Sequence, residues 1–244
     1  MYISHLLIDV GNNPDRPRPG RLWLRNLYHV HQRLCMAFPS DPRLKDDPEF
    51  LKPFNPEDFG NGHVCVTREP DTGFLFRVDP LSGGRVMLLV QSAIWPKWDY
   101  AFQNVPFLSA CEVKPFDAAF ENGQRLRFRL VANPTRKICT KTGADGRRRH
   151  GKRVPVPTDQ LFDWLARKAK ESGFSINTGS TTIQPGYVYA NRKPDSKGQR
   201  LRSVLYEGIL TVAIADKFNS TLIQGVGPGK AFGFGLLSVA PVHS

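Results

Sequence analysis

Strand-like and helix-like segments follow one another in the same order in both halves of the chain, and this order restricts the fold more than any other feature. The first half reads strand, helix, strand, strand, helix, strand at about 2–9, 26–38, 74–78, 85–92, 97–103 and 108–113, with an extra short strand at 63–67 left open. The second half repeats the order at about 124–132, 158–172, 174–178 with 187–191, 201–214, 215–224 and 236–240, around a hairpin or loop at 136–153. We therefore predict an α+β protein of two split β-α-β units, with domains at 1–114 and 115–244. The halves share no convincing sequence repeat, so element order alone carries this prediction.

The strand at 124–132 has the clearest side-chain alternation. Leu126, Phe128 and Leu130 fall on one face, and three arginines fall on the other: Arg125, Arg127 and Arg129. One face is thus predicted to be buried. The other is either an ordinary solvated sheet face or a surface for a polyanion, and the absence of acids within the row favours the second.

The excess of positive over negative charge lies entirely in the second half of the chain. The sequence holds 34 Lys and Arg against 22 Asp and Glu, a net charge of +12, and residues 1–114 hold 13 of each sign. Most of the excess falls in two clusters. The clusters are Arg136, Lys137, Lys141, Arg147, Arg148, Arg149, Lys152 and Arg153, and Arg192, Lys193, Lys197, Arg200 and Arg202. Such a one-sided excess indicates a partner with repeated phosphates, with solvated loops as the alternative.

Composition excludes several classes of protein. Apolar residues make up 40% of the chain, enough for a packed core. The 4 cysteines form no CxxC pair, so a zinc knuckle and a disulfide framework are not expected, and a reducing compartment fits. No apolar run approaches the roughly 18 residues of a spanning helix, and the N-terminus lacks the features of a signal peptide. We expect a cytoplasmic protein without membrane contact.

A glycine-rich segment, GVGPGKAFGFG at 225–235, matches neither common phosphate-binding loop. Gln224 and Ala231 break the Walker pattern, and a dinucleotide loop would follow a strand and open a helix, the reverse of the order here. The backbone can approach closely either to phosphates or to a neighbouring helix, and both alternatives stay open. The glycines concerned are Gly225, Gly227, Gly229, Gly233 and Gly235, with Lys230 at the apex.

The final segment, GVGPGKAFGFGLLSVAP, closely resembles the C-terminal signature of the CRISPR-associated CasE family, the repeat-processing endoribonucleases of type I-E systems. MYISHLLID, RNLYHVHQRLCMAFP, RLRFRLVANP and LYEGILTV resemble the same family, so the similarity extends from Met1 to Pro241. The stretches at 10–20 and 40–62 lie outside it. The resemblance implies two tandem ferredoxin-like (RNA-recognition-motif-like) domains, without a cofactor or metal. It also implies binding of a CRISPR repeat hairpin, one cut at its 3′ base, and a product that stays bound and enters Cascade with its other subunits. We expect a monomer in the free state.

In the first helix of that family a tyrosine and a histidine three residues apart carry cleavage, and the matching residues here are Tyr28 and His31. Residues at this spacing are neighbours on one helical face. Imidazole suits proton transfer because its pKa lies near neutrality. His31 could serve as either acid or base, and three alternatives stay open for the second partner: a lysine, an arginine or the environment of the 2′-OH itself. His31 lies beside an apolar stripe of the helix, so the alternative is that it is a partly buried structural histidine. His29 is predicted to point elsewhere.

The family carries a basic hairpin against the RNA stem at the position of the second cluster. We predict that the RNA is held by Arg127, Arg129, Arg136, Lys137, Arg147, Arg148, Arg149, Lys152, Arg153, Arg192, Lys193 and Lys230. Shape and phosphates should dominate recognition, because A-form RNA hides its base edges in a deep groove.

Three other functions compete with RNA cleavage as explanations of this sequence. A non-catalytic RNA-binding scaffold of the same fold is the main alternative, and a double-stranded DNA binder is a weaker one. A two-metal nuclease is disfavoured by the position of the acids. Asp46, Asp47, Glu57 and Asp58 lie in the stretch at 40–62, which we predict to be a surface insertion, and not at the ends of predicted helices or strands.

Overall fold

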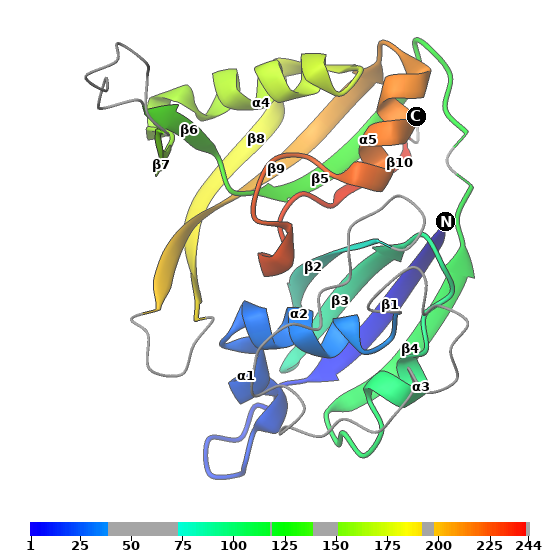
Figure 1. Ribbon diagram of the computed structural model, residues 1–244, viewed down its shortest axis with the longest axis vertical. Coiled ribbons are helices and arrows are strands. Elements are labelled where there is room, and N and C mark those ends of the chain that lie inside the picture. The colour runs from blue at the N-terminus through cyan, green and yellow to red at the C-terminus, as the bar shows by residue number, and fades with distance from the viewer. Residues whose placement is uncertain (39–72, 118, 139–150, 192–197, 243–244) are drawn as a thin grey trace, which may run out of the picture.

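The computed structural model describes residues 1–38, 73–117, 119–138, 151–191 and 198–242, and it contains two four-stranded antiparallel sheets (Figure 1). The possible strand at 63–67 and the insertion at 40–62 lie outside the described residues.

The first sheet has the strand order β2-β3-β1-β4, and every neighbouring pair is antiparallel. Its strands are β1 (Tyr2–Asp9), β2 (Phe74–Leu81), β3 (Arg85–Ser92) and β4 (Leu108–Pro115). Its helices are α1 (Pro19–Leu24), α2 (Leu27–Cys35) and α3 (Trp98–Ala101). Helix α2 packs Val30 and Leu34 onto the sheet face that carries Leu6 and Leu88, and all four side chains are fully buried.

The second sheet has the order β10-β5-β9-β8, again antiparallel throughout. Its strands are β5 (Arg125–Ala132), β8 (Phe174–Ala190), β9 (Gln199–Val212) and β10 (Leu237–Pro241). Helices α4 (Leu161–Glu171) and α5 (Ala215–Gln224) cover one face, with the single turns η4 (Thr158–Gln160) and η5 (Lys230–Phe232) beside them in sequence. A separate hairpin consists of β6 (Thr135–Ile138) and β7 (Lys152–Pro155).

Both sheets place the four strands of a β-α-β-β-α-β unit in the spatial order 4-1-3-2, which is the ferredoxin-like arrangement. The predicted fold class is therefore confirmed. The first sheet draws on residues 2–115 and the second on residues 125–241, and the division of the chain at residue 114 stays a prediction.

The glycine-rich loop carries two phenylalanines of the second half into the core of the first. Phe232 and Phe234 are buried in the same apolar cluster as α2 and β2. Gly225 ends α5 with φ 74°, and a Cβ there would lie 2.8 Å from both a Leu75 methyl carbon and the carbonyl oxygen of Gly235. At Gly229, with φ 84°, it would lie 2.8 Å from the Phe234 ring. These contacts favour packing over ligand binding as the reason for the glycines.

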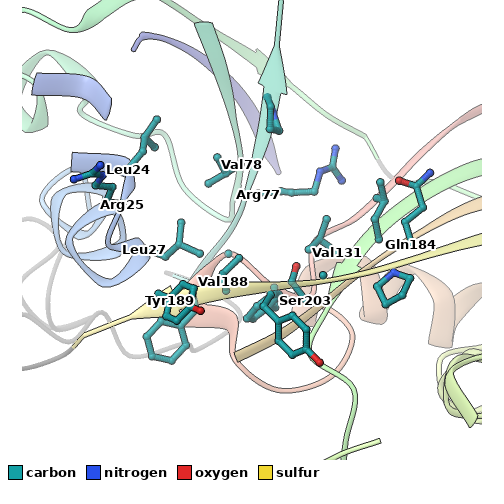
Figure 2. Close-up of a pocket in the computed structure, with 18 residues that line it drawn as sticks. Leu24, Arg25, Leu27, Arg77, Val78, Val131, Gln184, Val188, Tyr189 and Ser203 are labelled. Carbon is teal, nitrogen blue, oxygen red and sulfur yellow. The ribbon is translucent and has the colours of Figure 1, made fainter. Parts of the chain in front are cut away.

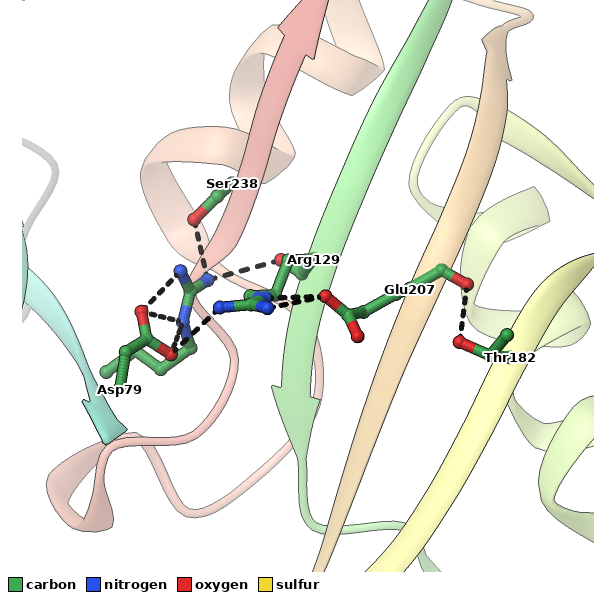
Figure 3. Close-up of polar contacts among 6 residues, drawn as sticks. Asp79, Arg129, Thr182, Glu207 and Ser238 are labelled. Carbon is green, nitrogen blue, oxygen red and sulfur yellow. Dashed lines mark hydrogen bonds and ion pairs between the residues drawn. The ribbon is translucent and has the colours of Figure 1, made fainter. Parts of the chain in front are cut away.

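A charged network joins the two halves behind that loop (Figure 3). Arg77 on β2 is only 4% exposed, and its Nε donates to the Asp79 carboxylate at 2.8 Å. Its Nη1 donates to Ser238 Oγ at 2.6 Å and to the carbonyl oxygen of Arg129 at 3.3 Å, both in the second sheet. The Arg129 side chain in turn pairs with Glu207 at 2.7 Å and lies 3.7 Å from Asp79. Edge strand β2 is thus buried on both faces because the second half covers the face turned away from α2.

The elements differ from the prediction in three places. Pro19 opens helix α1 between the strand predicted at 2–9 and the helix predicted at 26–38, where no element was expected, since proline is well suited to the first turn of a helix. Helix α2 ends at Cys35, before the expected Phe38. The two strands predicted at 174–178 and 187–191 are one strand, β8, whose register shifts between Ile176 and Thr181. The polar residues of that bulge resemble a turn in sequence.

We expect Gly225→Ala to destabilise the protein more than Gly123→Ala does. Gly123 also has a positive φ, 82°, but a Cβ there would meet nothing within 4 Å. Both variants place an alanine at a positive φ, which costs about 1–3 kcal/mol, and Gly225→Ala should cost about 1–3 kcal/mol more because its methyl group overlaps Leu75 and backbone. Urea denaturation of the two proteins measures the difference, and equal midpoints would contradict the packing role.

Candidate active site and RNA interface

Helix α2 brings the two predicted catalytic side chains together. Its N-cap is Asn26, whose side-chain oxygen accepts a hydrogen bond from the backbone N–H of Tyr28 at 3.1 Å. The rings of Tyr28 and His31 are 6.3 Å apart between centroids, and both side chains are half-buried. His29, by contrast, is exposed. Tyr28 and His31 can therefore act on one bound group, while His29 faces solvent elsewhere on the helix.

One side of the His31 ring is fixed by packing. The Phe74 ring lies 5.5 Å away and the Phe76 ring 6.3 Å away, the latter nearly parallel at 13°. Cys35, one turn further along α2, places its Sγ 3.6 Å from His31 Nε2. These neighbours restrict the rotation of the imidazole without enclosing it. Packing against apolar side chains, which is expected of a structural histidine, would therefore also orient a reactive one.

The turn of the glycine-rich loop that packs beside this pair carries a lysine. The Phe232 ring of η5 lies 6.3 Å from the Tyr28 ring, and η5 packs against α2. Lys230 is the first residue of the same turn and is half-buried. A positive charge at this position would stabilise charge that develops on a phosphate held against Tyr28 and His31.

Arg33, two residues beyond His31, serves a different purpose. Its Nη1 donates to the carbonyl oxygen of Ala101 at 2.8 Å, at the end of α3. Burial lowers the pKa of this guanidinium, but the ordinary pKa of arginine is so high that the side chain stays charged. Arg33 thus ties α2 to its own sheet.

The β6–β7 hairpin carries exposed cations on both of its strands. Arg136, Lys137, Lys152 and Arg153 are all exposed, and Lys137 lies directly opposite Arg153 in the register. Like charges at facing positions destabilise a ladder unless an anion neutralises them. In Figure 1 the hairpin stands beside α4, separated from α2 along the long axis of the molecule. A ligand that contacts both regions must be extended.

The arms of β8 and β9, formed by residues 187–190 paired with residues 199–202, carry aromatic and guanidinium groups. Tyr187 and Tyr189 are 51% and 62% exposed, and the Arg200 guanidinium lies 3.6 Å from the centroid of the Tyr187 ring. Arg202 donates to Thr158 Oγ1 at 2.7 Å. Stacked arginine and exposed tyrosine are surfaces on which nucleic-acid bases and phosphates bind.

The remaining residues predicted to contact RNA differ in their surroundings. Arg127 is exposed on the open face of β5, as expected. Arg129 pairs with acids from two other strands, since Glu207 reaches it from β9 and Asp79 from β2. The other predicted residues lie outside the described part of the chain: Arg147, Arg148, Arg149, Arg192 and Lys193.

A pocket of about 510 Å³ separates α1 and α2 from β8 (Figure 2). Leu24, Arg25 and Leu27 line it on the helical side, and Val188 and Tyr189 line it on the side of β8. No pattern in the sequence indicates this pocket or the bonds between Asn26 and Asn191 beside it, because both depend on segments about 165 residues apart.

Features of two other protein classes are absent from the described residues. No three His, Cys, Asp or Glu side chains gather there in a way that could hold a metal ion. Within the same ranges, no helix combines the length and the apolar character needed to cross a membrane.

Comparisons with known proteins agree with this architecture. A family model described as CRISPR associated protein matches residues 1–241. The chain is 36% identical over 191 residues to the CRISPR-associated endoribonuclease Cse3 of Thermus thermophilus, covering 72% of this chain and 85% of that protein. It is 27% identical to the CRISPR system Cascade subunit CasE of Escherichia coli, over 99% of this chain and 100% of that one.

Solved structures show the same likeness in three dimensions. A structure of Cse3 bound to a 19-nucleotide RNA superposes with a TM-score of 0.71 at 30% identity, covering 99% of this chain and 100% of that one. Thermus thermophilus Cse3 bound to an RNA that represents a pre-cleavage complex gives 0.69 at 29% identity, with 98% of each chain covered. The resemblance read from the sequence is thereby confirmed, and the chain belongs to the CRISPR-associated CasE family.

Proposed function

We propose that this protein is an endoribonuclease that binds the stem-loop of CRISPR repeat RNA and cuts it once at the 3′ base of the hairpin. The observation that carries the proposal is the pairing of Tyr28 and His31 on one face of α2, beside the turn that bears Lys230. The names of the relatives support RNA cleavage, and the RNA-bound structures of Cse3 support an RNA substrate.

The proposed reaction is attack by the ribose 2′-oxygen on the adjacent phosphorus, without a metal ion. The 2′-OH loses a proton, the bond from phosphorus to the 5′-oxygen breaks, and that oxygen gains a proton. The products are a 2′,3′-cyclic phosphate and a 5′-OH. His31 carries one of the two proton transfers, Tyr28 orients the ribose or phosphate, and Lys230 offsets charge on the phosphorane.

The cations of the second half hold the substrate in this proposal. Exposed charges on β6–β7 contact phosphates of the stem, and the β8–β9 arms contact nucleotides nearer α2. After the cut the mature guide RNA stays bound, and the protein joins the other subunits of Cascade. The E. coli relative, a Cascade subunit, supports this assembly.

A non-catalytic scaffold of the same fold is the second candidate. The specific observation in its favour is the packing of His31 against Phe74 and Phe76, which a purely structural histidine would share. Whether the purified protein shortens a repeat RNA separates the two functions.

His31→Ala should lower the single-turnover rate on a cognate repeat RNA in EDTA by about 10²–10⁴-fold, because a positioned proton-transfer group is lost. His29→Ala is the matched control, since His29 is exposed on the same helix, and it should stay near the wild-type rate. Undiminished cutting by His31→Ala, or loss of wild-type cutting in EDTA, contradicts the mechanism.

A substrate with 2′-deoxyribose at the cut site should bind normally and resist cleavage, because the attacking oxygen is missing. Gel-shift affinity and cleavage are measured on the same pair of RNAs, and the wild-type product is tested for a 2′,3′-cyclic phosphate. Cutting of the deoxy substrate would show that another nucleophile is used.

The double variant Lys137→Gln/Arg153→Gln should weaken RNA binding and reduce the slope of log affinity against log salt by about 1.4–1.8, if each side chain neutralises one phosphate. The control is Arg167→Gln/Lys168→Gln on α4, whose cations both pair with Glu171. A slope equal to that of the control would place the β6–β7 hairpin outside the RNA interface.

A further inference from the structure

Asn26 makes contacts that a helix cap does not require. Its Oδ1 accepts from the Tyr28 N–H, as a cap should, and also from the backbone N–H of Asn191 at 3.1 Å. Its Nδ2 donates to the carbonyl oxygen of the same Asn191 at 2.8 Å. The side-chain amide therefore pairs with Asn191 as a neighbouring strand would, and only asparagine or glutamine offers both a donor and an acceptor in this way.

This clamp lies where the second half of the protein meets α2. Asn191 follows Ala190, the last residue of β8, and Ala190 is buried in the core cluster of the first half. Val188 and Leu201, on the two facing arms, are partly buried against that cluster. On either side of Asn26, Arg25 and Leu27 line the pocket that separates α1 and α2 from β8 (Figure 2). Asn26 and Asn191 thus form a direct polar link beside an open space.

The link has a mechanical consequence for the pair on α2. The oxygen that holds Asn191 also holds the N–H of Tyr28, and His31 lies one turn further along the same short helix. A shift of β8 at Asn191 is therefore transmitted to the first turn of α2. In the sequence, the residues directly after Asn191 are Arg192 and Lys193, two of the cations predicted to contact RNA.

We infer that Asn26 is a positioning residue for RNA cleavage: it couples the β8 arm to the orientation of Tyr28 and His31 through its paired bonds to Asn191. The inference rests on the proposed function. It requires that the clamp affect the rate of bond cleavage in bound RNA more than it affects RNA affinity. A misplacement of about 1 Å between reacting groups can cost 10²-fold in rate, so a clamp of this kind matters without touching the substrate.

Two substitutions separate positioning from capping. Asn26→Ser and Asn26→Asp both keep an oxygen that caps the helix, and both remove the donor to Asn191. Asn122→Ser is the matched control, because the Asn122 Oδ1 accepts from the Ala215 N–H at 2.8 Å at the start of α5, in the second half of the chain. Each protein is assayed at saturating concentration for its single-turnover rate, and with the 2′-deoxy substrate for its dissociation constant.

We expect Asn26→Ser to cut about 10–100-fold more slowly than wild type with a dissociation constant within about threefold, Asn26→Asp to be slowed in the same sense, and Asn122→Ser to match wild type. Hydrogen exchange supplies a readout independent of activity: the Asn191 amide should exchange faster in Asn26→Ser. A wild-type rate in Asn26→Ser, a defect confined to affinity, or unchanged protection of Asn191 would overturn the inference. Normal cutting by His31→Ala would instead overturn the proposed function, whatever Asn26→Ser does.

Discussion

The burial of Phe232 and Phe234 in the core of the first half is the contact on which the rest of the structure depends. A loop from the end of the chain completes the apolar cluster under α2, so the helix with Tyr28 and His31 has its full set of neighbours only when both halves are folded together. Removing a buried phenylalanine typically costs about 3–5 kcal/mol, a large share of the stability of a domain. The glycines follow from this requirement, because the backbone must turn sharply and pass close to Leu75 and Phe76.

Tyr28 is consequently surrounded by elements from both halves. The η5 turn packs against its ring, and β8 reaches the cap of its helix through Asn26 and Asn191. Tyr28 and His31, the proposed catalytic pair, lie on a nine-residue helix and gain their orientation from these outside contacts, since helices this short are marginal alone. The proposed chemistry thus lies on the first half and the net positive charge of the chain on the second, and a few named side chains join the two.

Local patterns were sufficient for most of the fold. The alternation of Leu126, Phe128 and Leu130 identified a half-buried strand, and the start of the helix expected at about 26–38 was also located, because each depends on residues close in sequence. The bonds of Asn26 to Asn191 and of Arg77 to Ser238 could not be predicted in this way, since they join segments more than 150 residues apart. The same limit explains the expectation for Arg129: no acid lies in its own strand, and Glu207 and Asp79 come from two others. Continuous strand β8 was missed because its bulge has the polar composition of a turn.

Arg77 and Asp79 have an implication for how the molecule can move. Rotating one sheet against the other would separate Arg77 from Ser238 and from the Arg129 carbonyl, and leaving donors of a buried guanidinium unpaired costs about 1–3 kcal/mol or more, even though Asp79 stays paired with Arg77 on the same strand. Hinge closure around a ligand is therefore disfavoured at this interface between β2 of the first sheet and β5 and β10 of the second. Conformational adjustment during docking is then expected mainly in the ligand and in the arms of β8 and β9, which extend beyond the interface between the two sheets (Figure 1).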